Sequence, residues 1–255
     1  MKYQKTEISK IIRIGTEYAY LQFTGDSLVE GEPGQFVMIR GSWGNDPILP
    51  RAFSLVESGT SGGILVRDVG IGTSLLCNMK EGDPLFVLGP LGSPYEMPET
   101  DETAVLVAGG VGVAPLFFLA KHLRKHNIKT VFIYGARTSE DLPLSDEIGK
   151  ITELRVTTED GTTGKKGLVT DELKTLLETD SKFSVYSCGP HKMLQAVGDL
   201  STKNSARCQV ALESPMACGM GTCKGCAIKD VDGNFKYVCT DGPVFEAARV
   251  FGGQK

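Results

Sequence analysis

The segment ESPMACGMGTCKGC, residues 213–226, holds three cysteines at a C-x4-C-x2-C spacing, and one more cysteine follows at position 239. This spacing is typical of the four thiolate ligands of a plant-type [2Fe-2S] cluster. The predicted ligands are Cys218, Cys223, Cys226 and Cys239. The glycines between them fit this prediction, because a loop that wraps a cluster needs positive φ angles and close backbone approach.

Zinc and disulfide bonds are the alternatives for these four cysteines. Zinc sites more often pair two C-x2-C units, whereas here the second half is the single Cys239. The spacing therefore favours an iron–sulfur cluster over both alternatives.

Length and charge describe an ordinary globular chain. Its 255 residues can form two domains with a small appendage, and a net charge of -4 gives no reason to expect nucleic-acid binding. No apolar run approaches the length of a membrane span, and residues 1–7 lack the apolar core of a signal peptide. The seven cysteines are therefore expected in a reducing compartment, the cytoplasm, where thiols bind metals more often than they form disulfides.

Residues 1–98 show short β-type runs separated by glycine and proline. The expected strands cover residues 11–14, 18–23, 35–40, 52–56, 63–67 and 84–88. Turn sequences such as Glu32-Pro33-Gly34 separate these runs at the spacing of a sandwich or barrel. This part is expected to form a small antiparallel β-barrel.

After residue 98 the pattern changes to strands that alternate with helices. The expected strands cover residues 103–108, 130–134, 154–158 and 183–188, and the expected helices cover residues 113–126, 139–150, 170–177 and 190–203. Such alternation predicts βαβ units and a parallel sheet. The expected fold is thus multi-domain: an antiparallel β-barrel over 1–98, an α/β parallel-sheet nucleotide domain over 99–205 and a small C-terminal [2Fe-2S] module over 206–255.

The tetrapeptide Arg51-Ala52-Phe53-Ser54 suits a flavin. The arginine can pair with a pyrophosphate, the phenylalanine can pack on an isoalloxazine ring, and the serine can hydrogen-bond the flavin edge. An ordinary barrel strand is the alternative, because the tetrapeptide is common. The segment Gly70-Ile71-Gly72-Thr73-Ser74 adds weight, since it predicts a glycine turn that opens a short helix and could hold a phosphate.

The segment Gly109-Gly110-Val111-Gly112 lies where a buried strand leads into a helix. Ligands of open α/β sheets bind at this end of the strands, where glycine lets a dinucleotide approach the backbone. Cys188-Gly189-Pro190 ends the fourth strand in the same geometric position. Neither segment is a full G-x-G-x-x-G fingerprint, so a tight turn and a buried thiol are the alternatives. Hydrolytic catalysis is unsupported, since the serines lack a His/Asp partner set, and electron transfer between cofactors needs no side chain as a catalytic acid or base.

The order of these motifs resembles the ferredoxin–NADP reductase-like flavoproteins, in which a flavin barrel precedes a pyridine-nucleotide domain. The tetrapeptide at 51–54 matches that family's R-x-[YF]-S motif, although many relatives have proline where this chain has Ala52. The resemblance implies FAD binding by Arg51, Ala52, Phe53, Ser54, Leu65, Val66, Arg67, Gly72 and Thr73. It implies NAD binding by Gly109, Gly110, Gly112, Cys188, Gly189 and Pro190.

The C-terminal cysteine motif is similar to that of the electron-transfer subunits of class B, NAD-dependent dihydroorotate dehydrogenases. This resemblance implies an oxidoreductase subunit with FAD and [2Fe-2S] that pairs, in a heterotetramer, with an FMN-containing catalytic subunit. The catalytic subunit would oxidise dihydroorotate in pyrimidine biosynthesis, and the electrons would pass through the cluster and FAD to NAD+.

Two other functions stay open at this point. The chain could be an NAD(P)H diaphorase subunit that serves another partner, such as a hydrogenase or ferredoxin, or a non-catalytic iron–sulfur redox sensor. NAD is preferred over NADP because Glu140-Asp141, after the second strand of the α/β part, disfavours a 2′-phosphate, although the nearby Arg137 favours one.

Overall fold

The N-terminal strands close into an antiparallel barrel, as predicted. In the computed structural model, which describes residues 1–25, 30–179 and 181–252, the strands are β1 (Lys2–Ile14), β2 (Tyr18–Thr24), β3 (Phe36–Gly41), β4 (Arg51–Glu57), β5 (Gly62–Arg67) and β6 (Pro84–Leu91). Their order around the barrel is β1-β2-β5-β4-β3-β6, and a short helix, α1 (Ile71–Cys77), follows β5. Alternate side chains, among them Leu21, Ile39 and Ile64, fill the interior and are fully buried.

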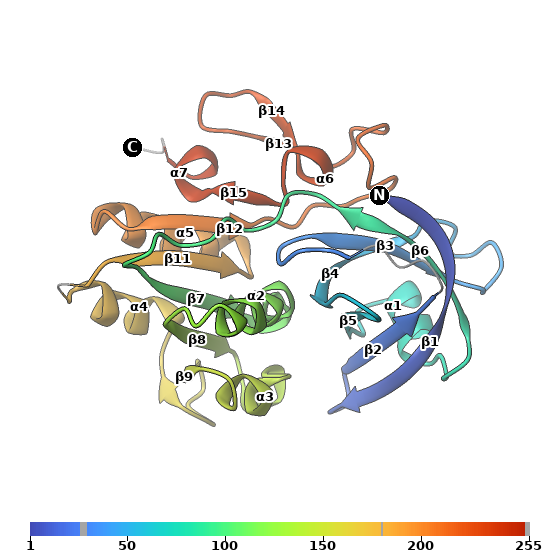
Figure 1. The fold of residues 1–255 in the computed structure, drawn as a ribbon, viewed down its shortest axis with the longest axis horizontal. Coiled ribbons are helices and arrows are strands. Elements are labelled where there is room, and N and C mark those ends of the chain that lie inside the picture. The colour runs from blue at the N-terminus through green and yellow to red at the C-terminus, as the bar shows by residue number, and fades with distance from the viewer. Residues whose placement is uncertain (26–29, 180, 253–255) are drawn as a thin grey trace.

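The second domain is a mostly parallel sheet covered by helices (Figure 1). Its strands are β7 (Thr103–Gly109), β8 (Thr130–Ala136), β9 (Glu153–Thr158), β10 (Lys165–Lys166), β11 (Phe183–Cys188), β12 (Arg207–Ala211) and β15 (Val244–Glu246), in the order β10-β9-β8-β7-β11-β12-β15. Its helices are η1 (Gly110–Gly112), α2 (Val113–Lys125), η2 (Ser139–Asp141), α3 (Ser145–Gly149), α4 (Val169–Leu177) and α5 (His191–Lys203). Every residue of β7 is buried, as expected for a central strand with both faces covered.

One expected helix, over residues 139–150, is wrong. The structure has the short turn η2 and the five-residue α3 there, separated by residues 142–144. Pro143 removes a backbone donor, and Leu144 takes a left-handed conformation with φ 67°, so the two helices cannot be continuous. No helix in the described part of the chain is both long enough and apolar enough to cross a membrane.

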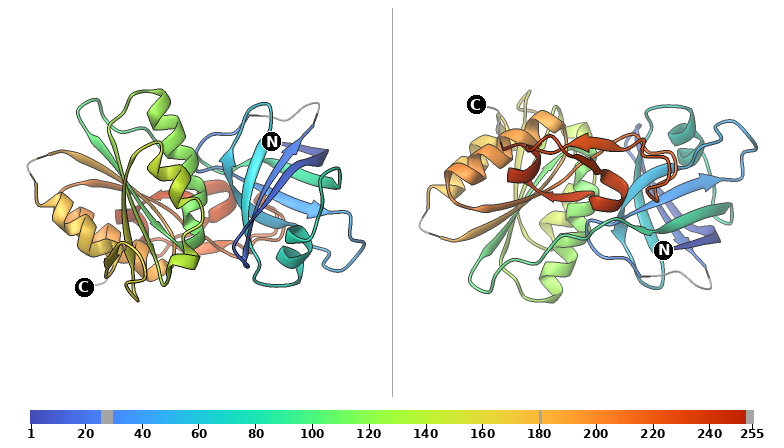
Figure 2. Two further views of the ribbon diagram at one scale, coloured as in Figure 1. Left: turned by 90° about the horizontal axis from the view of Figure 1, so that it is seen from below. Right: turned by 90° about the horizontal axis from the view of Figure 1, so that it is seen from above.

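The C-terminal segment lies across both domains. It contains β13 (Ala227–Lys229), β14 (Phe235–Tyr237), α6 (Val238–Asp241), β15 and α7 (Ala247–Val250). The view from above in Figure 2 shows this segment over the junction between the barrel and the α/β domain. β12, placed by the sequence in the C-terminal module, pairs in parallel with β11, and β15 pairs antiparallel with β12. The α/β sheet therefore continues beyond the expected boundary at residue 205.

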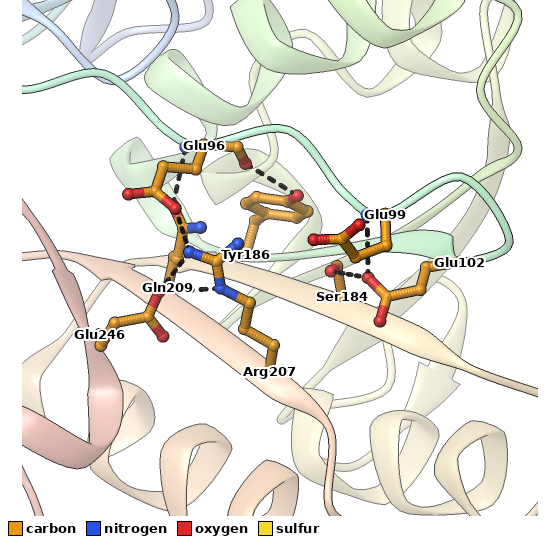
Figure 3. A network of polar contacts seen from close by, with 8 residues as sticks. All are labelled: Glu96, Glu99, Glu102, Ser184, Tyr186, Arg207, Gln209 and Glu246. Carbon is orange, nitrogen blue, oxygen red and sulfur yellow. Dashed lines mark hydrogen bonds and ion pairs between the residues drawn. The ribbon is translucent and has the colours of Figure 1, made fainter.

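A polar network joins the linker between the domains to the far edge of the sheet (Figure 3). Arg207 on β12 forms ion pairs with Glu246 on β15, at 2.7 Å, and with Glu96 on the linker. The Glu96 carbonyl accepts a hydrogen bond from the Tyr186 hydroxyl at 3.0 Å. The network thus connects the linker, β11, β12 and the C-terminal segment.

A second polar group lies where the barrel meets α2. Glu57 on β4 accepts a hydrogen bond from Gln22 Nε2 at 2.7 Å and pairs with Lys121 Nζ at 3.5 Å. Burial acts to raise the pKa of Glu57, but hydrogen bonds from Tyr20 and Gln22 and the charge of Lys121 outweigh it, so the pKa lies below its ordinary value.

We expect Glu57→Gln to lower the free energy of unfolding by about 1 kcal/mol at pH 7, since it removes a charge-assisted contact between the domains. A depressed carboxyl pKa stabilises the fold above the unfolded-state pKa, and this contribution is lost as the pH falls through the folded-state pKa. The difference between variant and wild type should therefore shrink below about pH 4.5, the ordinary glutamate value. Denaturant unfolding of both proteins at pH 7 and pH 4 measures the difference in the free energy of unfolding and its dependence on pH. An equal difference at the two pH values would contradict this account.

Candidate functional site

The first cavity, of about 460 Å³, lies between the barrel and the α/β domain. Most of the residues predicted to bind FAD meet in its wall: Arg51, Ala52, Phe53, Ser54, Leu65, Arg67 and Thr73. Val66 lies apart from them, because alternate residues of a strand face opposite sides and its side chain is buried in the barrel core. The α/β domain contributes Val111, Ala114 and Pro115.

Arg51 is held in place from two directions. Its guanidinium lies against Gly72, where a Cβ atom would come within 2.3 Å of Arg51 Nε, and its Nη1 donates to the Leu49 carbonyl. The adjoining turn is fixed by Thr73 Oγ1, which accepts the backbone N–H groups of Val69 and Gly70 at 2.9 and 3.0 Å. A fixed arginine beside a glycine turn fits the diphosphate of a flavin dinucleotide.

We expect Arg51→Met to weaken FAD binding by about 1.5–3 kcal/mol, or roughly 10- to 150-fold, the usual contribution of hydrogen bonds to a charged group. Titration of the cofactor-free protein with FAD, followed by flavin fluorescence, measures the effect. Arg13→Met is the matched control, because Arg13 also lies on the barrel but contacts Asn78 outside the cavity. If the two variants bound FAD with equal affinity, Arg51 would not belong to the FAD site.

The second cavity, of about 390 Å³, lies at the carboxyl ends of the parallel strands. Gly109, Gly110 and Pro190, all predicted to bind NAD, line it. Gly112, Cys188 and Gly189 form the structure next to it: a Cβ on Gly112 would lie 2.3 Å from the Cys188 carbonyl oxygen and 2.7 Å from the Gly189 nitrogen. These glycines therefore let η1 and the end of β11 pack directly backbone to backbone.

The two cavities adjoin. Gly110 lines the second cavity, the next residue, Val111, lines the first, and Arg67 lines both. The single turn η1 thus forms the wall between the space expected for FAD and the space expected for NAD.

Arg67 connects the barrel to the α/β domain. Its guanidinium pairs with Glu17 at 2.7 Å and with Asp141 at 3.1 Å, and the Tyr18 hydroxyl donates to the same Asp141 oxygen at 3.2 Å. Asp141 is therefore engaged between the domains, and it also lines the second cavity. Glu159, at the end of β9, lines the second cavity as well and supplies a further acidic group there.

Cys188 is a buried thiol close to a carboxyl group. Burial, and then the nearby charge of Glu213, raise the pKa of Cys188 well above its usual value, so the group stays protonated. Glu213 itself lines the first cavity, and its side chain is exposed to the open space of that cavity. Because protein surrounds this space, burial raises the pKa of the Glu213 carboxyl.

The four predicted cluster ligands come together in two pairs. The Cys226 and Cys239 sulfurs lie 3.2 Å apart and are buried. The Cys218 sulfur accepts the backbone N–H groups of Cys223 and Met220 at 3.4 and 3.5 Å. Burial acts to raise the pKa of Cys218, but these N–H groups outweigh it and lower the pKa to about 7.

Two pairs of thiols fit a two-iron cluster, in which each iron takes two cysteines. A structural zinc site instead needs four ligands around one ion. The donor set and its backbone N–H groups therefore suit [2Fe-2S] better than zinc.

The cysteine loop packs directly on the barrel wall of the first cavity. Cys226 and Cys239 share an apolar core with Phe36, Met38 and Leu91. Gly219, with φ +71°, lies so close to Met38 that a Cβ atom would come within 2.5 Å of its Cγ. Since Phe36 also lines the first cavity, one layer of apolar side chains separates the cluster ligands from the flavin space.

Comparison with known proteins agrees with this arrangement. Residues 213–251 match the family model "Iron-sulfur cluster binding domain of dihydroorotate dehydrogenase B", and residues 106–199 match the model "Oxidoreductase NAD-binding domain". The dihydroorotate dehydrogenase B (NAD(+)) electron transfer subunit of Fusobacterium nucleatum is 37% identical, and the match covers 98% of this chain and 99% of that protein. The same subunit of Caldanaerobacter subterraneus is 40% identical over 86% of each chain. This chain belongs to the family of dihydroorotate dehydrogenase B electron transfer subunits.

Solved structures extend the comparison for this family member. A structure of the NADH-dependent reduced ferredoxin–NADP oxidoreductase, described for flavin-based electron bifurcation, is 31% identical with a TM-score of 0.86, and the match covers 96% of this chain and 89% of that one. The ferredoxin reductase of carbazole 1,9a-dioxygenase, 21% identical with a TM-score of 0.71 over 80% of this chain and 66% of that one, shares the fold. The predicted fold class is thus confirmed.

One wall of the first cavity in this electron transfer subunit is not evident from the sequence. The residues of that wall come from the C-terminal segment: Leu212, Glu213, Ser214, Met216 and Pro243. Glu213 and Met216 stand within the cysteine motif, but nothing in their local sequence shows that they face the barrel. Their role depends on the way the segment crosses the domain junction.

Proposed function

We propose that this chain passes electrons between an FMN-containing dihydroorotate dehydrogenase subunit and NAD+, in the cytoplasm, within a heterotetramer. The observation that carries the proposal is spatial order. The nucleotide cavity adjoins the flavin cavity across η1, and the flavin cavity adjoins the cluster cysteines across Phe36. Nicotinamide, flavin and cluster sites thus follow one another without an intervening domain.

The residues of the chain bind and orient rather than exchange protons. Bound FAD supplies the link between the two kinds of transfer, since a flavin can exchange either a hydride or single electrons. Arg51 and the turn at Gly72 and Thr73 would hold the FAD diphosphate, and the glycines of η1 would let the nicotinamide approach the flavin closely. The Cys188 thiol, which lies behind η1, stays neutral and adds no charge next to the nucleotide cavity.

The exposed side of the cysteine loop suits the partner subunit. Cys223 and the neighbouring Met220, Thr222 and Lys224 are exposed, whereas Cys226 and Cys239 are buried toward the barrel. Single electrons can pass between the FMN and the cluster only if the two cofactors come close, so we place the FMN-containing subunit against this side.

NAD is the proposed nucleotide, with Glu159 as the residue that disfavours a 2′-phosphate. A carboxylate at the end of β9 would repel that phosphate, while it can accept a hydrogen bond from a free ribose hydroxyl. Arg137, which also lines the cavity, acts in the opposite direction.

A visible spectrum of the protein purified without air, before and after addition of NADH, tests the proposal. We expect flavin and [2Fe-2S] bands that NADH bleaches, and slower bleaching by NADPH. A colourless, zinc-containing protein would overturn the cluster and flavin assignments together, and faster bleaching by NADPH would overturn the choice of nucleotide.

A second candidate is a diaphorase subunit that serves ferredoxin, favoured by the similarity to the reduced ferredoxin–NADP oxidoreductase chain. The two candidates differ in the donor that reduces the flavin. Reduction by dihydroorotate with its FMN subunit supports the first candidate, and reduction by reduced ferredoxin alone supports the second.

A further inference from the structure

The flavin cavity has walls from three parts of the chain, and one wall belongs to the cluster-binding segment. Arg51, Phe53 and Ser54 of the barrel face this cavity together with Glu213, Met216 and Pro243 of the C-terminal segment. The barrel alone therefore encloses only part of the space for FAD.

Residues 242–246, named here the bridging segment, connect this wall to both domains. The Ser93 N–H donates to the Gly242 carbonyl at 2.7 Å, which joins the segment to the chain leaving the barrel. The Leu212 N–H donates to the Pro243 carbonyl at 2.9 Å, and Val244 pairs with Ala211 in the sheet. The cavity wall at 212–216 is thus held through the bridging segment.

The far end of the bridging segment is fixed by Arg207. Figure 3 shows this side chain between Glu246 of the bridging segment and Glu96 of the linker. On the barrel side, Val244 packs so closely on Gly34 that a Cβ there would lie 2.9 Å from Val244 Cγ2. The segment therefore contacts the barrel, the linker and the sheet within five residues.

Between the two cavity-wall stretches the chain has little regular structure, and the residues that pack on the barrel, Gly219 and Val238, lie next to the cysteines. Residues 217–241 contain only two three-residue strands, β13 and β14, and the four-residue helix α6. Cys218 lies two residues after Met216, and Cys239 lies three residues before Gly242. A cluster bound to both cysteines would tie the two stretches of the cavity wall together, because metal ligation contributes directly to the folding of small modules.

We propose that assembly of the cluster completes the flavin cavity, so that the chain holds FAD tightly only when the cluster is in place. This inference rests on the proposed function, since it assumes that FAD and [2Fe-2S] are the resident cofactors. It assigns residues 212–216 and 242–246 a role in cofactor retention and gives cofactor loading an order, cluster first. A subunit without its cluster would then also lack FAD, and so it could not pass electrons from NADH to oxygen.

FAD affinity with and without the cluster tests the inference. FAD binding is titrated by flavin fluorescence in the holoprotein, in protein stripped of iron by a chelator, and in stripped protein after cluster reconstitution. We expect stripping to raise the dissociation constant of FAD by a factor between about 5 and 150, the range usual for coupled sites, and reconstitution to reverse it. By linkage, saturating FAD should slow iron loss to the chelator.

Two variants sharpen the test. Phe235→Ala is the control: its side chain is 61% exposed on the hairpin of the same segment and lies outside the cavity wall, so FAD affinity should not change. Val244→Ala keeps all four cysteines but removes the contact with Gly34, so FAD affinity should fall although the cluster spectrum is intact.

Hydrogen exchange of the stripped protein separates the outcomes. Faster exchange confined to residues 212–216 and 242–246, with weaker FAD binding, supports the inference. Unchanged FAD affinity after stripping overturns it, and so does loss of protection throughout β1–β6, which would make the cluster a support of the whole fold. A holoprotein that binds no flavin contradicts the proposed function instead.

Discussion

Cys226→Ala is expected to abolish electron exchange with the FMN-containing subunit while NADH-dependent reduction of a soluble dye persists in excess FAD. Cys226 is buried beside Cys239, so its loss removes a ligand from the better-protected pair. Mutation of groups that only support metal ligands typically lowers metal affinity or activity by about 10- to 100-fold. Loss of a ligand should therefore lower the rate of electron exchange by more than about a hundredfold. The dye takes electrons from the flavin directly and needs no cluster.

Rates for both acceptors, measured on the same preparation, check this prediction. Excess FAD is included because the cluster also completes the flavin cavity in our proposal. Cys77→Ala is the matched control, since Cys77 is a buried cysteine in α1 of the barrel, away from the cluster loop. Equal loss of both activities in Cys226→Ala, but not in Cys77→Ala, would mean that the cluster serves the structure and not the electron path.

Local patterns predicted most of the fold because each reports on its own segment. The apolar run of β7 and the glycine turns of the barrel encode burial and chain reversal within a few residues, so element types were correct. The exception, at 139–150, came from reading helical composition across Pro143, whose missing donor divides the segment.

The site was predictable where a motif lies on one element, and not where the chain brings separate elements together. Arg51, Phe53 and Ser54 lie within four residues of β4, so their shared cavity follows from their closeness in the sequence. The cavity wall at Glu213 and Pro243 depends on the path of the C-terminal segment across the domain junction, which no local pattern encodes. The contacts of Asp141 are likewise not encoded locally, because its partners Arg67 and Tyr18 belong to the barrel.

The cysteine spacing carries more information than the residue types alone. It predicts four thiolate ligands of one cluster, and the structure adds that Cys226 and Cys239 are buried side by side whereas Cys223 is exposed. Unequal burial gives the cluster a side toward the flavin cavity and a side toward solvent, which is the polarity that a relay between two proteins requires.

Gly112→Ala is expected to reduce the rate of flavin reduction by NADH by about a hundredfold or more, because misplacement by about 1 Å can cost that much in an oriented reaction. The new Cβ would lie 2.3 Å from the Cys188 carbonyl oxygen and 2.7 Å from the Gly189 nitrogen. Both neighbours are backbone atoms of a buried strand end, so neither can rotate away as a side chain could. The turn η1 must therefore shift, and with it the wall between the nucleotide and flavin cavities.

Stopped-flow bleaching of the flavin by NADH measures this effect, and the flavin and cluster spectra show whether both cofactors are retained. Gly149→Ala is the matched control in the same domain, since its Cβ would meet nothing closer than Leu154 at 3.9 Å. An unchanged rate in Gly112→Ala would mean that η1 does not set the nicotinamide position. A slow rate with both spectra intact would instead locate the defect at the hydride transfer itself, because electron exchange between the flavin and the cluster does not involve η1.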